Sequence, residues 1–327
     1  MKIVIPGGSG QVGTILARHF HASGDDVVVL SRNARQAAWR VVDWDGVTVG
    51  AWRDEIDGAD VVVNLAGRSV NCRYHTANRR AIYYSRVDAT RAVGRAIAEC
   101  RRPPAVWLQM STATIYSHRY DTPQDESSGI LGGCEPNAPS TWRFSIDVAK
   151  AWEQAAEEFS TPGTRRVLMR SAMVLSPDRG GVFDTLRRLV RLRLGGAAGD
   201  GRQYISWIHE FDFVRAVEWL IDRDLSGIVN VAAPGPLPNV EFMRALRHAD
   251  GVRLGLPATE WMIEIGAWLL RTESELILKS RRVVPGRLLH DGFEFGYPNW
   301  PAAVAELCSR RLVGTVAHAQ AVHHSTT

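Results

Sequence analysis

The feature that most constrains the fold is a glycine-rich turn placed directly after the first apolar run. Residues 3–5 read Ile-Val-Ile, and residues 7–13 read Gly-Gly-Ser-Gly-Gln-Val-Gly, followed to Phe20 by apolar residues at helical spacing. Strand, glycine turn and helix in this order are the context of a dinucleotide fingerprint. The glycines let a pyrophosphate approach the backbone N–H groups at the helix N-terminus, which a Cβ would block. We therefore predict a cofactor-binding loop rather than a purely structural turn, formed by Gly7, Gly8, Ser9, Gly10, Gln11, Val12 and Gly13.

The end of the second apolar run indicates which dinucleotide binds. Residues 27–30 read Val-Val-Val-Leu and are followed by Ser31-Arg32-Asn33, with no acidic residue. NAD sites usually carry an acid here to hold the ribose 2′-hydroxyl, whereas a guanidinium matches the oxygens of a 2′-phosphate. Arg32 therefore favours NADP, the alternative being a solvated arginine. Asp43, after residues 40–42, is expected near the adenine.

Alternating segments downstream predict an α/β protein. Residues 60–67, 105–110 and 166–170 have the composition of buried strands, and residues 78–100 and 145–159 that of helices. Strands that alternate with helices imply a parallel, doubly wound Rossmann sheet. Leu65, Ala66 and Gly67 end the first of these strands, and the small pair Ala66-Gly67 permits close approach of the cofactor.

The pattern loosens after residue 175 and predicts a smaller C-terminal substrate-side domain. We assign residues 1–175 to an NADP-binding Rossmann domain, to which residues 205–233 return. Residues 176–204 and 234–311 form the substrate side, and residues 312–327 a disordered tail. A strand at residues 205–209 and helices at residues 212–221, 240–249 and 259–270 are expected. The loop at residues 195–204 and the last of these helices are expected to shape the pocket.

Composition excludes several classes of protein. The 39 basic and 35 acidic residues give a net charge of +4 without a dense basic block, which argues against nucleic-acid binding. No segment has the run of about 18 apolar residues that a membrane helix needs, and the first apolar run is too short for a signal peptide. The four cysteines are far apart and show no metal spacing. We expect a cytoplasmic monomer or homodimer with a small-molecule substrate and no metal.

In combination, the motifs resemble the "epimerase family protein" group of atypical short-chain dehydrogenases/reductases (the YfcH type), which is similar to sugar-nucleotide epimerases. The resemblance covers almost the whole chain and implies an NADP-type Rossmann fold, with Leu65, Ala66, Gly67 and Arg86 at the cofactor. The ending at residues 281–298 is similar to the family's C-terminal domain of unknown function. The segments that carry the resemblance are residues 7–13, 64–67, Ser85-Arg86-Val87 with Thr90, 152–153, 180–181, 201–203, 206–209 with Asp212, 233–236, 281–288 and 292–298.

The resemblance also implies where catalysis takes place. The extended members use a Ser or Thr, a Tyr, and a Lys four residues after that Tyr. Thr112 stands at the hydroxyl position and Lys150 at the lysine position, but Ile146 occupies the tyrosine position. We therefore expect Thr112 to bind the substrate oxygen, Tyr116 to relay a proton, and Lys150 to hold the nicotinamide ribose. A solvated helix lysine is the alternative for Lys150.

Two further polar features and the function itself have alternatives. His209 and Asp212 suggest a catalytic dyad, although Asp212 is more simply the cap of the helix that follows. Arg170, at the end of a strand, is either a ligand-binding residue or half of a structural ion pair. Three functions stay open: an NADP-dependent oxidoreductase acting on a small carbonyl or alcohol, a sugar-nucleotide epimerase or dehydratase, and a non-catalytic NADP-binding sensor or scaffold.

Overall fold

A seven-stranded parallel sheet forms the centre of the molecule, as the alternating segments predict. The structure, a computed structural model, describes residues 1–33, 35–136, 138–269 and 273–310. The strand order is β10-β6-β5-β4-β1-β2-β3, and every neighbouring pair is parallel. The strands are β1 (Lys2–Pro6), β2 (Asp26–Ser31), β3 (Arg40–Asp43), β4 (Val61–Asn64), β5 (Val106–Thr112), β6 (Arg165–Ser171) and β10 (Gly227–Val231).

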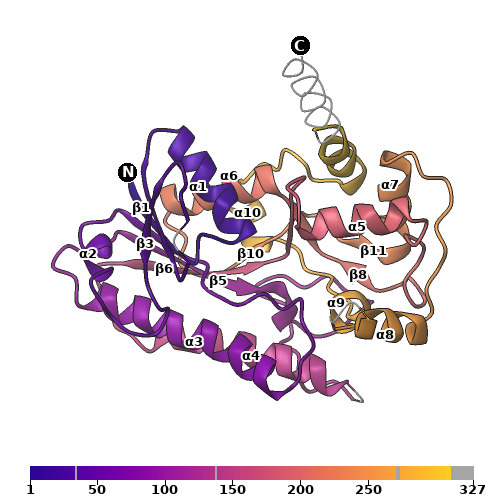
Figure 1. The fold of residues 1–327 in the computed structure, drawn as a ribbon, viewed down its shortest axis with the longest axis horizontal. Helices are drawn as coiled ribbons and strands as arrows, with labels where there is room; N and C mark the ends of the chain where they lie inside the picture. The colour runs from indigo at the N-terminus through magenta and orange to yellow at the C-terminus, as the bar shows by residue number, and fades with distance from the viewer. Residues whose placement is uncertain (34, 137, 270–272, 311–327) are drawn as a thin grey trace, which may run out of the picture.

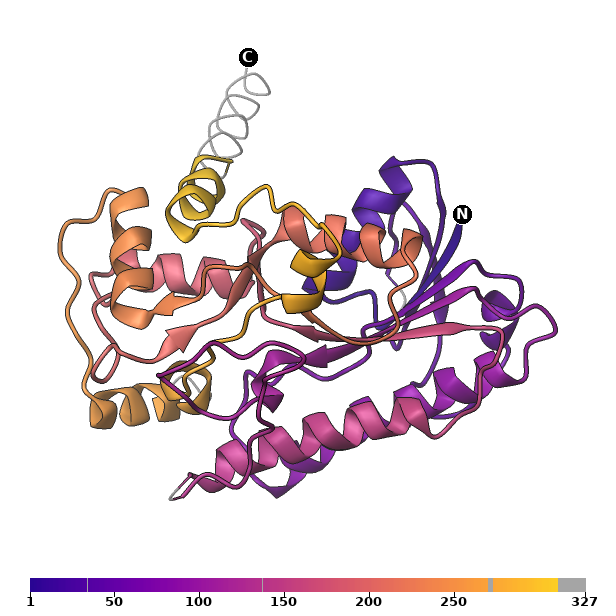
Figure 2. The ribbon, with the colours of Figure 1, turned by 180° about the vertical axis from the view of Figure 1, so that it is seen from behind.

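Helices cover both faces of this sheet, which makes it doubly wound (Figures 1 and 2). Helices α1 (Gln11–Ala22) and α6 (Glu210–Asp222) pack on one face, and α3 (Thr76–Ala98) and α4 (Ser140–Glu157) lie side by side on the other. Successive side chains of a strand point to opposite faces of the sheet, so each strand contributes to an apolar cluster on both faces. Ile3 and Ile5 join the apolar cluster under α1 and α6, whereas Val4 between them joins the cluster under α3. A short helix, α2 (Arg53–Ile56), and a 3₁₀ turn, η1 (Ala113–Ile115), complete this half.

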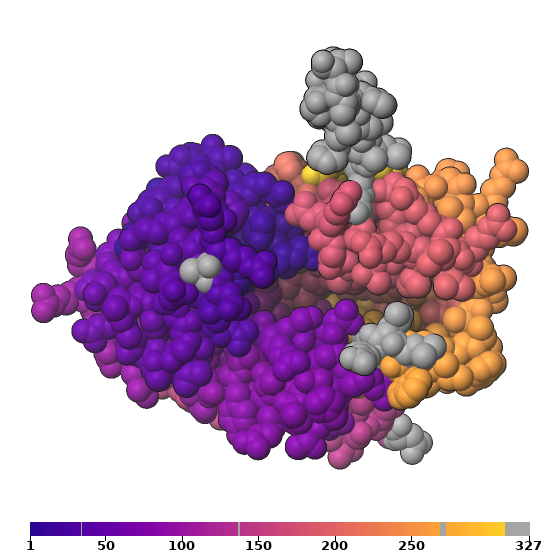
Figure 3. All heavy atoms as spheres, viewed as in Figure 1, coloured from indigo at the N-terminus to yellow at the C-terminus, as the bar shows by residue number. Residues whose placement is uncertain are grey.

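A third apolar cluster holds the smaller part of the molecule together. It joins α5 (Val182–Arg191), α7 (Asn239–Ala249) and a helical stretch at residues 300–310. The other elements after residue 171 are β7 (Met173–Leu175), β8 (Tyr204–Ile205), β9 (Trp207–His209), β11 (Leu237–Pro238), α8 (Glu260–Leu269), α9 (Glu275–Leu278) and α10 (Gly286–His290). Strand β7 pairs with β9, and β8 pairs with β11. A hollow separates the N-terminal segments from the part that contains α5 (Figure 3).

Several expected boundaries differ from the structure. The expected strand at residues 205–209 is two strands, because β8 pairs with β11 whereas β9 pairs with β7. Between them, the Ser206 hydroxyl donates to Arg281 O and accepts from Val283 N–H. Leu288 and Phe293 pack into the cluster under α6, so part of residues 234–311 returns to the main sheet rather than staying on the substrate side. Residue 270 of the expected helix and the expected tail at residues 312–327 lie outside the described residues. In the described part of the chain, no helix is long and apolar enough to cross a membrane.

Candidate active site

The glycine turn is packed so closely that Gly7, Gly8 and Gly13 admit no side chain, most severely at Gly7 and Gly13. Gly7 has φ +75°, and a Cβ there would lie 2.6 Å from Ala66 Cα at the end of β4. A Cβ on Gly13 would lie 2.4 Å from Gly8 Cα. Both separations are far below van der Waals contact. These glycines therefore fix the turn against β4 and α1 against the turn.

Gly10 has different surroundings, which fit a bound phosphate. It is the N-cap of α1, no side chain caps the helix, and no acidic residue stands in the first turn. A Cβ on Gly10 would meet only Gly7 O, at 3.8 Å. The first backbone N–H groups of a helix have no partner within it and attract anions. The open space above Gly10 is therefore a suitable cradle for a pyrophosphate.

The residues expected at the adenosine end lie beside this turn. Gly7 N–H donates to Leu30 O, and Ser31 Oγ donates to Ser9 Oγ at 3.0 Å, so β2 ends against the turn. Arg32 follows directly and is exposed. Asp43 ends β3 in register with Ser31, at the same edge of the sheet. The geometry thus brings together Ser9, Arg32 and Asp43.

Gln11 connects the turn to the substrate side of the molecule. A Cβ on Gly181 would lie 2.2 Å from Gln11 Nε2, so the loop before α5 crosses directly over the start of α1. Gln11 Nε2 is buried and has no hydrogen-bond partner among the described residues. Gly181 therefore has a packing role at the boundary between the two halves, whereas Gly180 has φ +79° and open space around it.

The residues that follow β4 lie between the glycine turn and Arg86, a half-buried arginine on α3. Asn64 orders this end, because its Oδ1 accepts Ala66 N–H and its Nδ2 donates to Gln109 Oε1 at 2.8 Å. A Cβ on Gly67 would lie 3.1 Å from Arg86 Cζ. Arg86, on α3, also stands over the Trp152 ring of α4, with its Cζ 5.0 Å from the ring centroid. Ala66, Gly67 and Arg86 are therefore contiguous.

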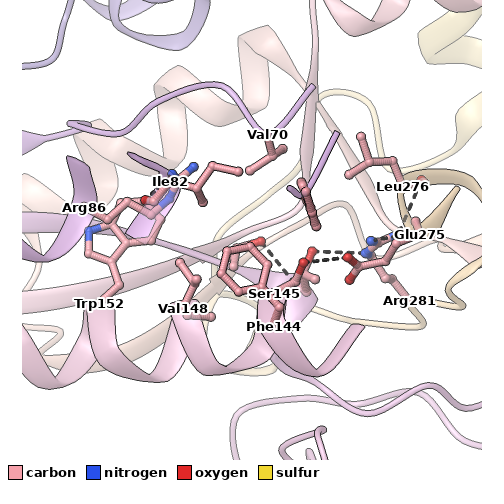
Figure 4. Close-up of a pocket in the computed structure, with 14 residues that line it drawn as sticks. Val70, Ile82, Arg86, Phe144, Ser145, Val148, Trp152, Glu275, Leu276 and Arg281 are labelled. Carbon is pink, nitrogen blue, oxygen red and sulfur yellow. Dashed lines mark hydrogen bonds between the residues drawn. The ribbon is translucent and has the colours of Figure 1, made fainter. Parts of the chain in front are cut away.

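A cavity of about 130 Å³ lies beside this arginine (Figure 4). It is bounded by α3, α4, α9 and the residues that follow β5. Most of its wall is apolar, and the polar groups lie at its two ends, with Arg86 at one and Ser145, Glu275 and Arg281 at the other. The lining residues are Val70, Tyr74, Ile82, Arg86, Thr112, Thr114, Phe144, Ser145, Val148, Ala149, Trp152, Glu275, Leu276 and Arg281.

The far end of the cavity contains a hydrogen-bonded acid. Ser145 Oγ donates to Glu275 Oε2 at 2.5 Å, while Glu275 Oε1 is buried and has no partner among the described residues. Burial raises the pKa of the Glu275 carboxyl, against the opposing effects of Arg281 and Ser145. Burial also raises the pKa of the Tyr74 phenol to about 12. Both groups are therefore stabilised in the protonated form that can donate to a ligand.

The three residues expected to be catalytic are separated by the structure. Thr112 lines the cavity, and its Oγ1 accepts Thr114 N–H at 3.2 Å. Tyr116 is buried in a separate apolar cluster, where its hydroxyl donates to Asn230 Oδ1 at 2.9 Å. Lys150 Nζ donates to Gly132 O at 2.9 Å and is not among the lining residues. Ile146, at the tyrosine position, is fully buried. Thr112 alone of the three faces the cavity.

The suggested dyad of His209 and Asp212 is wrong, and so is the cap assigned to Asp212. Helix α6 begins at Glu210, and His209 is its N-cap, with Nδ1 accepting Phe211 N–H. His209 Nε2 lies 2.8 Å from Glu306. The Asp212 carboxylate instead accepts the N–H groups of Gly296 and Tyr297, both at 2.8 Å. The two residues therefore fasten the C-terminal segment to α6.

Arg170 forms a structural ion pair, the second of the two roles considered for it from the sequence. Its Nε and Nη2 donate to the two oxygens of Glu153, at 2.8 and 2.7 Å, and both side chains are buried. Ser111 Oγ donates to the same carboxylate. This network lies between β6, β5 and α4 and holds the strand end that carries Thr112.

No local sequence signal marks Tyr74, Ser145 or Glu275 as lining residues, and Arg281 is marked only by the resemblance at residues 281–288. Ser145 adjoins Ile146, so the helix position alone marks it as a neighbour of the expected site. Glu275 and Arg281 come from a segment more than 120 residues later, and no local motif connects them to α4. Among the described residues, no cluster of His, Cys, Asp and Glu has the arrangement of a metal site.

Comparisons with known proteins agree with this geometry. Residues 3–232 match the model of the "NAD dependent epimerase/dehydratase family", and residues 258–307 match "Domain of unknown function (DUF1731)". The chain is 30% identical to the epimerase family protein SDR39U1 of Bos taurus over 94% of this chain and 99% of that one. It is 29% identical to the epimerase family protein YfhF of Bacillus subtilis, over 95% and 99% of the two chains.

Solved structures share the fold. The human epimerase family protein SDR39U1, crystallised with NADPH, has a TM-score of 0.80 and 26% identity, covering 94% of this chain and 99% of that one. The UDP-N-acetylglucosamine 4-epimerase of Bacillus cereus has a TM-score of 0.71 and 18% identity, over 96% of both chains. The second similarity concerns the fold alone.

Proposed function

The chain belongs to the NAD-dependent epimerase/dehydratase family and carries a DUF1731 domain, and from this premise we propose that it is an NADP-dependent oxidoreductase acting on a small carbonyl or alcohol. The bound dinucleotide would supply or accept hydride. Gly7, Gly10 and Gly13 form the pyrophosphate cradle in this proposal, and Arg32 binds the 2′-phosphate. The NADPH in the human relative supports the choice of NADP.

The observation that carries the proposal is the size of the cavity. A volume of about 130 Å³ is close to that of the engineered cavity of about 150 Å³ that accommodates one benzene molecule. It is well below the range of about 300–1,000 Å³ found for drug-sized ligands. A sugar nucleotide is a ligand of that larger class. The cavity therefore favours a compact substrate over the substrate of an epimerase.

The polar groups of the cavity support a role in proton transfer. Thr112 Oγ1 accepts Thr114 N–H and keeps its own hydrogen for a substrate oxygen, whereas Ser145 donates its hydrogen to Glu275. In this proposal Thr112 orients the substrate oxygen, Ser145 positions the Glu275 carboxyl, and the Oε1 side of that carboxyl, which has no partner among the described residues, holds the proton for the substrate. Tyr116 has no part in the proposal, because its hydroxyl is engaged by Asn230.

The proposal is tested by following NADPH oxidation with a panel of small aldehydes and ketones, benzaldehyde among them. Turnover is expected with at least one of them, and Thr112→Ala should lower it by about a hundredfold or more, whereas Thr112→Ser should retain most of it. A parallel panel of sugar nucleotides without added reductant tests the epimerase alternative. NADPH binding without turnover in either panel would favour the non-catalytic sensor or scaffold.

A further inference from the structure

Arg86 is a half-buried cation that faces the cavity without a carboxylate partner. Its Nη1 donates to Ile82 O at 3.1 Å, which is its one hydrogen bond within the described part of the chain. No Asp or Glu of that part lies within ion-pair distance of its guanidinium. Burial lowers the pKa of Arg86 to about 10. A guanidinium has five N–H donors, so most of its hydrogen-bonding capacity faces Trp152 and the cavity.

Other arginines withdrawn from solvent are compensated within the protein. Arg170 has Glu153, and Arg187 has Asp250. Arg281, at the other end of the cavity, donates to Thr114 Oγ1 and to backbone oxygens of α9, including Glu275 O. A charge removed from water without such partners is costly, and an anionic ligand would remove that cost. Arg86 therefore differs from the rest in needing an external partner.

The charges around the cavity also favour an anion. The titratable groups in its wall are Arg86, Arg281, Glu275 and Tyr74, and burial favours the neutral forms of the last two. Between the ends lie Ile82, Phe144 and Val148, which suit an apolar body. The wall thus presents positive charge and an apolar middle.

We propose that the substrate of this cavity is a small oxo or hydroxy acid whose carboxylate pairs with Arg86. The proposal deepens the function proposed above and rests on it for the reaction at the carbonyl or alcohol group. A guanidinium can bind a carboxylate through two parallel N–H donors, which fixes the orientation of the substrate. The nearness of Gly67 to Arg86 leaves one competing source of the anion, a phosphate of the dinucleotide.

The test compares acids with neutral analogues of the same shape. Benzoate and pyruvate, with benzamide and pyruvamide, are titrated into the wild-type protein by calorimetry, with and without saturating NADP⁺. The acids should bind at least about tenfold more tightly than the amides, since hydrogen bonds to charged groups contribute about 1.5–3 kcal/mol. Saturating NADP⁺ should leave their binding intact.

Variants then assign the effect to Arg86. Arg86→Met should weaken binding of the acids by about ten- to a hundredfold without changing amide affinity, and Arg86→Lys should restore part of it. The NADPH affinity of Arg86→Met decides between the acid and the cofactor, which the family resemblance places at Arg86. Arg91→Met, on the same helix but paired with Glu158, is the matched control and should change nothing. The amide affinity and the thermal unfolding curve report whether Arg86→Met is folded.

Three results would overturn the proposal. The first is equal binding of acids and amides to the wild type, and the second is no binding of either acid. The third is an Arg86→Met variant that loses NADPH affinity while keeping the acids, which would assign the anion to the cofactor. Binding of acids through Arg86 in a protein that oxidises no NADPH with any carbonyl would instead defeat the proposed function and leave the anion site in place.

Discussion

At the scale of single residues, Gly10 and Gly13 belong to one motif but have opposite surroundings. Gly10 has an ordinary extended conformation and open space, whereas Gly13 touches the backbone of Gly8. Gly10→Val should therefore cost only about 1 kcal/mol of unfolding free energy through the helix cap, yet abolish NADPH binding by filling the phosphate cradle. Gly13→Val should cost about 3 kcal/mol or more, because the backbone must move. Denaturant unfolding measures the stability of both variants, and calorimetry measures their NADPH affinity. Unchanged NADPH affinity in Gly10→Val would show that residues 7–13 are only a structural turn.

Arg32 tests the choice between the two dinucleotides. It is exposed at the end of β2, beside the turn, and no acidic residue follows the strand. Arg32→Ala should weaken NADPH binding by about ten- to a hundredfold through loss of a charge-assisted contact, and leave NADH binding nearly unchanged. Arg253→Ala, an exposed arginine between α7 and α8, serves as the control. If wild-type protein binds NADH and NADPH equally well, the assignment of Arg32 to the 2′-phosphate is wrong.

At the scale of elements, the sequence predicted the sheet well because its strands carry their own signals. The runs at residues 105–110 and 166–170 lie within two residues of the bounds of β5 and β6, whereas the run at residues 60–67 extends three residues past the end of β4. Helix starts were less certain, because the partners that cap them come from elsewhere. Asp212 looked like a cap by its type and position, yet its carboxylate binds the N–H groups of Gly296 and Tyr297, more than 80 residues later. Local sequence contains no information about such a partner.

The environments of two histidines, His209 and His118, indicate how the unfolding free energy depends on pH. His209 caps α6 and His118 contacts the start of the segment after α9, each with Nδ1 accepting a backbone N–H, from Phe211 and Ser280. Burial lowers the pKa of both imidazoles, although Glu306 opposes this at His209. The neutral forms are therefore favoured in the folded state. Their contribution is present above the ordinary histidine pKa of about 6.5 and is lost as pH falls through the lower folded values.

Unfolding free energy should accordingly fall between about pH 7.5 and 5, by about 1 kcal/mol for each hydrogen bond lost. Denaturant unfolding at a series of pH values measures it. His209→Asn retains a side chain suited to an N-cap but does not titrate, so its stability should depend less steeply on pH. A steeper dependence in that variant, or a wild type that gains stability on acidification, would contradict the assignment of neutral histidines.

At the scale of the whole molecule, the cavity exists only because distant segments meet. Thr112 ends β5, Ser145 lies on α4, and Glu275 and Arg281 come from the segment around α9. The expected site included Thr112, because the family resemblance places a hydroxyl residue at this position. The end of the cavity that contains Glu275 could not be predicted from the sequence, because it depends on how α9 packs against α4. Its volume of about 130 Å³ is the basis for proposing a compact substrate.

The most direct test of that account follows hydride itself. NADPH with deuterium at both C4 positions of the nicotinamide is incubated with the wild-type protein and the panel of small carbonyl compounds, and the products are analysed by mass spectrometry. The account predicts an alcohol that carries one deuterium on the former carbonyl carbon, with none formed by the Gly10→Val variant. Tight NADPH binding with no deuterium in any small alcohol would contradict it.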